Sequence, residues 1–387
     1  GGLSLPLPLS LYDQRIPLFM IVTGGGIAKL REQPQRALLL YGKMLQSEKD
    51  ILDRFTFAAL LKSCAQLKDL LRGSEIHCYI CRKGSLLESD DVFLASALVD
   101  MYSKCGSVSK AREVFDGLSV TLRNVVSWTA LISGYVDHGR SSDALLLYYH
   151  GIHMNERMAG AGLQPNHYTF VSLLKACGSL SDIENGRKLH DDIKTMGFLS
   201  NVYVGNTLVS MYGKCGDVIE AENVFNAALI HVRDAVSWNA MLSMYVAEGR
   251  GEKALELYTE MMKQSVIIND GTLACVIQAC SEIGNLESCK KLHFHVISCG
   301  FEHLQILGAV LIHAYERSGS MRDAQECFDE MTHADIVSWT SCLSGYSDRG
   351  DFKMSIYMIK EMVTANHKLD DFVFALILTC CSHTGLV

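Results

Sequence analysis

The side chains that could bind a metal ion in this sequence are its 14 histidines and 14 cysteines. His77, His190 and His293 stand 113 and 103 residues apart, so each lies in a different segment, whereas a metal site needs three or four ligands that converge. Cys78 and Cys81 form a C-x-x-C pair, but no second pair follows at the spacing of a zinc site. We therefore expect no bound metal and interpret the three histidines as packing or hydrogen-bonding groups.

Motifs of common catalytic sites are absent from the sequence. Neither a phosphate-binding G-x-x-x-x-G-K-[ST] nor a zinc-protease H-E-x-x-H occurs. Deamination of a base needs H-x-E with a downstream P-C-x-x-C, but no histidine is followed two residues later by glutamate and no proline precedes a cysteine. We therefore expect a protein that is not an enzyme and holds no cofactor.

Three tryptophans mark an internal repeat, the feature that decides the fold. They lie in VVSWTALISGY (125–135), AVSWNAMLSMY (235–245) and IVSWTSCLSGY (336–346). A second segment type recurs as VFLASALVDMYSKCG (92–106), VYVGNTLVSMYGKCG (202–216) and QILGAVLIHAYERSG (305–319). A third recurs as RFTFAALLKSC (54–64), HYTFVSLLKAC (167–177), DGTLACVIQAC (270–280) and DFVFALILTCC (371–381). Their order is constant, so the repeating unit is a triplet of about 100 residues.

Each member of the triplet has the pattern of a helical hairpin. Trp128, Leu131, Ile132 and Tyr135 recur at i, i+3, i+4 and i+7, one face of a helix, and Gly139 then interrupts the pattern before a second apolar stripe. We interpret the tryptophans as core between helices. A single hairpin cannot bury its stripe, but stacked neighbours can. The prediction is an all-α fold, a right-handed superhelical α-solenoid of helix-turn-helix repeats, rather than two or three globular domains.

Composition limits the function classes. A net charge of −8 argues against a nucleic-acid binder held by bulk charge alone. An apolar content of 49% excludes a disordered chain, and no apolar run approaches the roughly 18 residues of a membrane helix, so no membrane partner is expected. Six cysteines at two repeated positions are expected to be small buried hydrophobes: Cys64, Cys177, Cys280, Cys381, Cys105 and Cys215.

The three segment types resemble the motifs of the pentatricopeptide repeat (PPR) family, in the plant PLS subfamily that alternates P, L and S motifs. SWTALISGYVDHGRSSDAL is similar to a P motif, TFVSLLKACGSLSDIENGRKLH to an L motif and LVSMYGKCGDVIEAENVF to an S motif. The resemblance places L, S and P motifs in turn at 54–91, 92–124, 125–166, 167–201, 202–234, 235–269, 270–304, 305–335, 336–370 and, truncated, 371–387.

The ends and one motif depart from this pattern. Residues 1–53 form an N-terminal segment with a degenerate motif, in which RALLLYGKML (36–45) matches a second helix and the glycines at 24–26 spoil the first. Motif 125–166 carries an insertion near 154–162. The missing initiator Met and the ending HTGLV indicate a fragment.

The resemblance implies that the partner is single-stranded RNA, read one base per repeat. In this family the fifth residue of a motif faces the base edge and the last residue cooperates with it. Short polar side chains suit this role, because a buried base edge left unpaired costs about 1–3 kcal/mol. The pairs that resemble readers of adenine, adenine, uracil, cytosine (with uracil tolerated) and guanine are Ser96–Asn124, Thr129–Asn166, Asn206–Asp234, Asn239–Asn269 and Thr340–Asp370.

The remaining motifs are expected to read weakly or not at all. Ala309 with Asp335 is a weak reader, and the L motifs carry apolar fifth residues that cannot read a base edge. These are Ala58, Val171, Ala274 and Ala375. Because the family runs N to C along RNA 5′ to 3′, the implied target is 5′-A-A-n-U-(C/U)-n-n-G-3′.

Two further sets of residues are implied. Second residues are expected to clamp or stack on bases: Phe93, Val126, Tyr203, Val236, Ile306 and Val337. The thirteenth residues of the S motifs are expected to contact phosphates: Lys104, Lys214 and Arg317. The Asn and Asp residues that end the motifs could instead serve only as turn formers or helix N-caps.

The resemblance implies an RNA-specificity factor of a plant mitochondrion or chloroplast, which specifies a cytidine for C-to-U editing. A deaminase domain or other editing factors would then act in trans or follow residue 387. A factor for RNA processing, splicing or stability is the alternative within RNA biology. A protein-binding helical scaffold is the alternative of another class, because helical periodicity alone fits a peptide-binding solenoid equally well.

Overall fold

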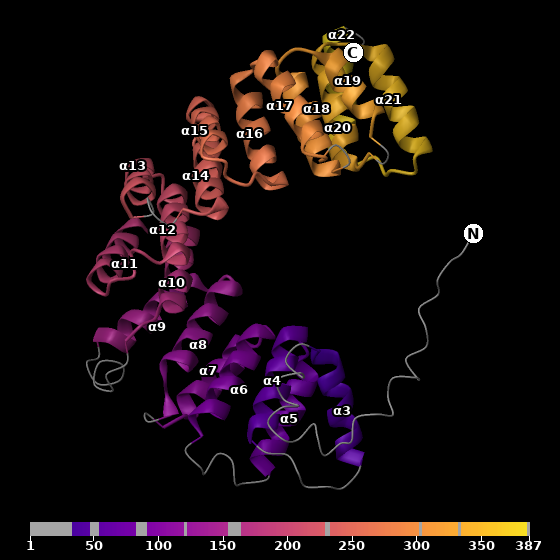
Figure 1. Cartoon of the computed structure of the whole chain (residues 1–387). Coiled ribbons are helices and arrows are strands. Elements are labelled where there is room, and N and C mark those ends of the chain that lie inside the picture. The colour runs from indigo at the N-terminus through magenta and orange to yellow at the C-terminus, as the bar shows by residue number, and fades with distance from the viewer. Residues whose placement is uncertain are drawn as a thin grey trace. The chain divides into compact units, whose positions relative to one another are not determined.

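The computed structural model describes residues 33–46, 54–82, 91–119, 122–153, 164–228, 233–301, 304–331 and 334–384. Within these residues every regular element is a helix, which confirms the predicted all-α class. The chain divides into two compact units, residues 1–196 and 197–387 (Figure 1).

The helices follow one another in short hairpins. Those of the first unit are α3 (Pro34–Gln46), α4 (Arg54–Leu67), α5 (Leu70–Arg82), α6 (Val92–Lys104), α7 (Val108–Gly117), α8 (Val125–Asp137), α9 (Ser141–His153), α10 (His167–Leu180) and α11 (Ile183–Thr195). Those of the second unit are α12 (Val202–Lys214), α13 (Val218–Asn223) with the π-helical turn η2 (Val224–Ala228), α14 (Ala235–Ala247), α15 (Gly251–Lys263), α16 (Asp270–Ile283), α17 (Leu286–Ser298), α18 (Gln305–Arg317), α19 (Met321–Asp329), α20 (Ile336–Asp348), α21 (Phe352–Thr364) and α22 (Asp371–Thr384).

The hairpin of α8 and α9 shows how sequence sets the turn. Gly139 adopts φ +73°, a left-handed conformation that glycine reaches without strain. The next residue, Arg140, donates its backbone N–H to the carbonyl of Tyr135 at 2.8 Å and closes the end of α8. Gly249 and Gly350 adopt similar φ values at the corresponding turns, so the glycine interruptions in the sequence mark the turns as predicted.

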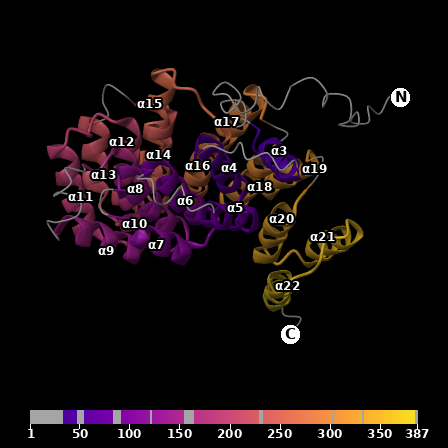
Figure 2. The same ribbon diagram turned by 90° about the horizontal axis from the view of Figure 1, so that it is seen from below.

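Within each unit the first helices of successive hairpins pack side by side. In the first unit this row is α4, α6, α8 and α10, and in the second it is α12, α14, α16, α18, α20 and α22 (Figure 1 and Figure 2). Most second helices contact both their own first helix and that of the next hairpin. Each unit is therefore a stack of helical hairpins, the arrangement that the repeats predict.

The tryptophans pack between helices, as predicted. Trp128 lies edge-on against Phe115 with ring centroids 4.8 Å apart, and Trp238 lies against Phe225 in the same way at 5.2 Å. Both indole rings are buried. Trp339 repeats the contact from a half-buried position. These residues are core and not stacking surfaces.

The prediction of buried cysteines is wrong for Cys381, which is half-buried, while its neighbour Cys380 is buried. The reason lies in α22, against which no second helix packs in the described part of the chain. Phe374 and Leu378 are 52% and 70% exposed there, although the corresponding residues of α4, α10 and α16 are buried.

The other five cysteines that the sequence predicts to be buried have mixed outcomes. Cys105 and Cys215 are half-buried rather than buried, because they lie at the C-terminal ends of α6 and α12. Cys64, Cys177 and Cys280 are buried as predicted.

Helix α3 contains the predicted second helix of the degenerate motif. The glycines at 24–26 and the insertion at 154–162 lie outside the described residues.

Candidate nucleic-acid interface

The last residue of each predicted P or S motif caps the helix that follows. Asn269 illustrates this cap: its Oδ1 accepts the backbone N–H of Thr272 at 2.9 Å, at the start of α16. The corresponding side chains accept the N–H of the third helical residue in the same way: Asn124, Asn166, Asp234, Asp335 and Asp370. These residues therefore do serve as helix N-caps. The cap engages one oxygen and leaves the other side-chain atoms available to further partners.

Three predicted reading pairs are joined by direct hydrogen bonds, although their members stand 28 to 30 residues apart. The bonds run from Asn206 Nδ2 to Asp234 Oδ1 at 3.2 Å, from Asn239 Nδ2 to Asn269 Oδ1 at 3.3 Å and from Ser96 Oγ to Asn124 Oδ1 at 3.1 Å. The Ser96 hydroxyl shares its one proton between Asn124 and the Val92 carbonyl, which lies 2.7 Å away. The structure thus brings the fifth residue of one motif against its last residue, at the junction of two hairpins.

The two threonine pairs differ from each other. The Thr129 hydroxyl lies 2.7 Å from that of Thr169, whose Oγ1 is 3.1 Å from Asn166 Oδ1, so Thr129 and Asn166 are linked through a third residue. The Thr340 hydroxyl donates only within its own helix, and Thr340 shares no hydrogen bond with Asp370 in the described part of the chain.

The carboxylate of Asp234 is held in its charged form. Burial works to raise its pKa, but the backbone N–H and hydroxyl of Ser237 and the amide of Asn206 donate to the carboxylate and outweigh that effect. The net result is a lowered pKa. At neutral pH the Asn206–Asp234 pair therefore presents an anionic acceptor beside an amide, a combination that can distinguish base edges.

The second residues of the motifs form exposed apolar groups in the first turn of each first helix. The exposed fractions range from 50% at Phe93 to 73% at Tyr203, with Val126, Val236, Ile306 and Val337 between them. Each of these side chains is one turn from a reading position. Sequence reasoning considered only P and S motifs and missed Phe55, Tyr168 and Phe372, the equivalent exposed aromatics of three L motifs.

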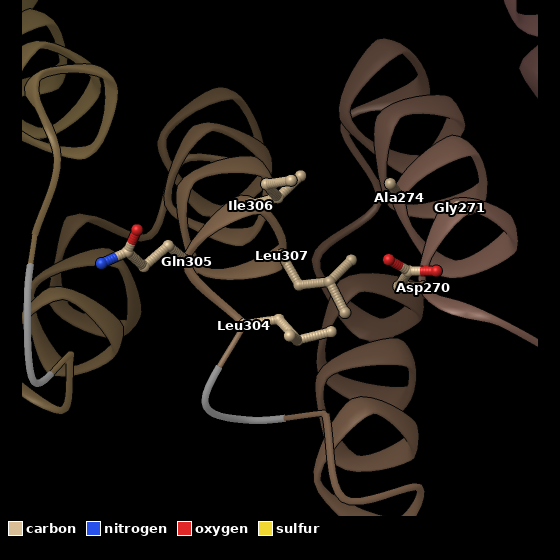
Figure 3. A pocket seen from close by; sticks show the side chains of 7 residues that line it. All are labelled: Asp270, Gly271, Ala274, Leu304, Gln305, Ile306 and Leu307. Carbon is tan, nitrogen blue, oxygen red and sulfur yellow. The ribbon is translucent and has the colours of Figure 1, made fainter. Parts of the chain in front are cut away.

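The remaining L motif, 270–304, has Gly271 at this position, and a cavity lies beside it. A cavity of about 450 Å³ lies between the starts of α16 and α18, lined by Asp270, Gly271, Ala274 and residues 304–307 (Figure 3). Ala274 and Leu304 occupy the fifth and last positions of this motif, and the side chain of Gln305 points away from α16 (Figure 3). The reading positions here thus supply no group that could hydrogen-bond a base edge.

The charged groups predicted to contact phosphates have different surroundings. Lys104 forms an ion pair with Asp100 at 2.9 Å, so its charge is already partly neutralised. All three side chains, Lys104, Lys214 and Arg317, are exposed at the ends of α6, α12 and α18. Arg317 also lies near Glu316, whose pKa is raised on balance, because burial and the charge of Asp348 outweigh the opposite effect of the Arg317 and Arg349 guanidinium groups.

His77 and His293 hydrogen-bond across neighbouring hairpins. His77 Nδ1 lies 2.9 Å from the hydroxyl of Tyr102, and His293 Nδ1 lies at the same distance from that of Tyr315. Burial lowers the pKa of both imidazoles, which therefore remain neutral at pH 7. The hydrogen-bonding interpretation is confirmed for these two residues. Among the described residues no group of three or more His, Cys, Asp or Glu could hold a metal.

No helix in the described part of the chain combines the length and apolarity required to cross a bilayer.

Two family models match the chain. The model described as the PPR repeat family matches residues 123–179 and 233–282, and the model described as the PPR repeat matches 93–118, 168–198, 206–227, 310–336 and 337–367. Together they match more than half of the sequence. The chain belongs to the PPR repeat family.

Similar PPR proteins are found in Arabidopsis thaliana. One pentatricopeptide repeat-containing protein is 35% identical over 86% of this chain and 44% of its own length. A chloroplastic one is 33% identical over 86% of this chain and 52% of its own length. A mitochondrial one is 35% identical over 80% of this chain and 47% of its own length. The PPR chain described here thus spans about half the length of these relatives.

Among solved structures, the PPR protein PPR10 is similar to this chain. In its complex with an 18-nt psaJ RNA element it is 21% identical, with a TM-score of 0.45 over 92% of this chain and 55% of PPR10. PPR10 from maize is 19% identical, with a TM-score of 0.42 over 97% of this chain and 64% of PPR10.

Proposed function

We propose that this chain binds single-stranded RNA in a sequence-specific manner, with one base at each reading pair. The observation that carries the proposal is the direct hydrogen bond between the fifth and last residues at three junctions. Two short polar side chains that already bond to each other lie beside an exposed apolar second residue. This arrangement offers a base both a face to pack on and an edge partner.

The chemistry favours recognition of base edges over attraction of the RNA backbone. The net charge of −8 supplies no attractive field for phosphates. Affinity must then come from contacts made in partly dehydrated sites, where each satisfied hydrogen bond contributes about 0.5–1.5 kcal/mol. Amide and carboxylate groups fixed at helix N-termini are well suited to this, because the cap holds them in one conformation before RNA arrives.

The proposed target is 5′-A-A-n-U-(C/U)-n-n-G-3′, read by the motifs from 92–124 to 336–370. The three unread positions fall on the L motifs 167–201 and 270–304 and on the S motif 305–335. In each of these the fifth residue is apolar. The cavity beside Ala274 supports an unread nucleotide at motif 270–304, because its two reading positions are apolar.

We further propose a role as the specificity factor for C-to-U editing in a chloroplast or mitochondrion. The constant L, S, P order of the motifs supports this assignment to the PLS subfamily. The names of relatives in both organelles support the location. The catalytic zinc chemistry would belong to a deaminase domain that follows residue 387 or to a factor acting in trans, because these 387 residues carry no H-x-E with a downstream P-C-x-x-C.

A gel-shift experiment with the target octamer and a scrambled octamer tests the proposal. We expect preferential binding of the target. The variant Thr129→Asn creates at motif 125–166 the Asn–Asn pair of motif 235–269, and its preference at the second nucleotide should move from adenine toward cytosine. Equal binding of both octamers, or none, would favour the protein-binding scaffold instead.

A further inference from the structure

Two of the L motifs expose the same pair of side chain types on one helix face. In motif 54–91 the second residue is Phe55 and the ninth is Lys62, and in motif 167–201 they are Tyr168 and Lys175. Seven residues make almost two helical turns, so each lysine lies on the same face as its aromatic residue, about 10 Å further along the helix axis. All four side chains are exposed.

The residue before each aromatic residue packs against its ring. The Arg54 guanidinium lies 4.9 Å from the centroid of the Phe55 ring, and the ring centroids of His167 and Tyr168 are 4.0 Å apart. Phe55 and Tyr168 nevertheless remain 48% and 64% exposed. Each ring therefore offers a supported apolar surface on which any base can stack, because every base has a π-face.

Both lysines are free to bind an anion. Neither ammonium group forms an ion pair or a hydrogen bond within the described residues. Lys104, by contrast, is partly neutralised by Asp100. Lys62 and Lys175 therefore have their full positive charge available.

The charge of the first helices differs between the two units. In the first unit, α4, α6, α8 and α10 contain four cations and two carboxylates. In the second unit, α12, α14, α16, α18, α20 and α22 contain two cations and five carboxylates. The row of first helices in the first unit is thus cationic in a chain of net charge −8. Such nearby charges act most strongly on a bound phosphate, because salt screens charges beyond about 8 Å.

The L motif 270–304 lacks both members of the pair. Its second and ninth residues are Gly271 and Gln278. There is room for a side chain at Gly271, because an added Cβ would meet Asn269 Oδ1 at 3.5 Å, an ordinary contact distance. The cavity beside Gly271 takes the place of the aromatic ring (Figure 3). Motif 371–387 has the ring of Phe372 but Thr379 instead of the lysine.

We propose that the L motifs 54–91 and 167–201 are nucleotide clamps, which bind RNA without reading its sequence. The aromatic ring stacks on a base of any type, and the lysine binds a backbone phosphate. Neither contact depends on the base edge, in agreement with the apolar fifth residues Ala58 and Val171. This inference rests on the proposed function and deepens it, because the clamps contribute affinity and leave specificity to the reading pairs.

The register of the proposed target gives each L motif its nucleotide. Motif 167–201 takes the third nucleotide of the octamer, and motif 54–91 takes the nucleotide that precedes the octamer on its 5′ side. Motif 270–304, which has no clamp, takes the sixth nucleotide. The third and sixth nucleotides are both unread, so they differ only in whether a clamp holds them.

Octamers with an abasic nucleotide at the third or the sixth position test the stacking contact in the wild-type protein. Loss of the base should raise Kd at least about fivefold at the third position and less than about twofold at the sixth, where Gly271 offers no ring. In Tyr168→Ala the penalty at the third position should disappear. Phe372→Ala, which removes an exposed ring from the second unit, is the matched control and should retain it.

The salt dependence of octamer binding tests the phosphate contact. Lys175→Gln should reduce the slope of log Kd against log salt by about 0.7, the value for one phosphate contact on a single strand. Lys188→Gln is the matched control, because Lys188 is an exposed lysine of the same motif on the second helix α11. Its slope should equal that of the wild type.

A nonamer with one further nucleotide on the 5′ side tests the clamp of motif 54–91. It should bind at least about fivefold more tightly than the octamer, with the same gain for all four bases. Phe55→Ala and Lys62→Gln should each reduce this gain, and Lys175→Gln should not.

Equal abasic penalties at the third and sixth positions would overturn the proposal, as would equal salt slopes for Lys175→Gln and Lys188→Gln. A nonamer that binds no more tightly than the octamer, or whose gain depends on the added base, would also overturn it. A wild-type protein that binds the target and scrambled octamers equally would instead refute the proposed RNA reading itself.

Discussion

Ala309→Asn should create a new uracil reader. Ala309 is the fifth residue of motif 305–335 and is 6% exposed, while Asn206 at the same position of motif 202–234 is 9% exposed. Asp335 already receives the Ser338 backbone N–H at 2.9 Å and its hydroxyl at 2.8 Å. Asp234 receives the same two groups from its own serine at 2.8 and 2.9 Å. The junction therefore lacks only the asparagine.

The substitution should lower the stability of the folded state modestly. Asparagine in place of alanine costs about 0.5 kcal/mol of helix propensity, and the new hydrogen bond to Asp335 returns about 1 kcal/mol. The Oδ1 of Asn206 is buried without a partner in the described residues, and an amide oxygen left in that state at position 309 costs about 1–3 kcal/mol. The unfolding free energy should thus fall by about 0.5–2.5 kcal/mol. In the complex, one additional base contact should favour uracil at the seventh nucleotide by about five- to tenfold over the other bases.

Anisotropy titrations with four octamers that differ only at the seventh nucleotide measure this preference. Ala274→Asn is the matched control, because the last residue of its motif is Leu304 and cannot accept a hydrogen bond. Ala309→Val is a second control that adds bulk without a donor. A folded Ala309→Asn variant with no uracil preference would refute the reasoning. A preference of equal size in Ala274→Asn would also refute it.

Three other predictions concern stability and charge. Burial lowers the pKa of His293, so on acidification the unfolded chain takes up a proton that the folded chain does not. The unfolding free energy should therefore fall between about pH 7.5 and 5.5. In urea unfolding, His293→Asn should show a smaller fall over this range than the wild type, and a fall of equal size would contradict this. Trp238→Ala should lose about 3–5 kcal/mol in the same measurement, and a loss below about 1 kcal/mol would contradict a core role. Arg317→Gln should reduce the slope of log Kd against log salt by about 0.7 if Arg317 contacts a phosphate, and an unchanged slope would exclude that contact.

Sequence patterns predicted the hairpins because the physics there is local. The apolar spacing from Trp128 to Tyr135 defines one helix face, and Gly139 supplies a left-handed turn that few other residues adopt. Pairing of residues such as Asn206 and Asp234 follows from the repeat length, since every hairpin returns the chain to the same level of the stack.

Other features depend on contacts that a single repeat does not specify. Cys381 was predicted to be buried from its repeat position, but its burial depends on a second helix against α22. The ion pair of Lys104 with Asp100 has i, i+4 spacing. This spacing on a helix could have been recognised in the sequence, but comparing the repeats position by position does not reveal it.

Selection from a randomised RNA pool tests the central claim most directly, because it assumes neither the target nor its register. The account predicts enrichment of adjacent adenines, a uracil two nucleotides further on, a pyrimidine directly after it and a guanine three nucleotides later. It predicts no base preference at the unread nucleotides, which are the third, sixth and seventh of the octamer. Enrichment of an unrelated motif, or no enrichment at all, would contradict base reading by these residue pairs.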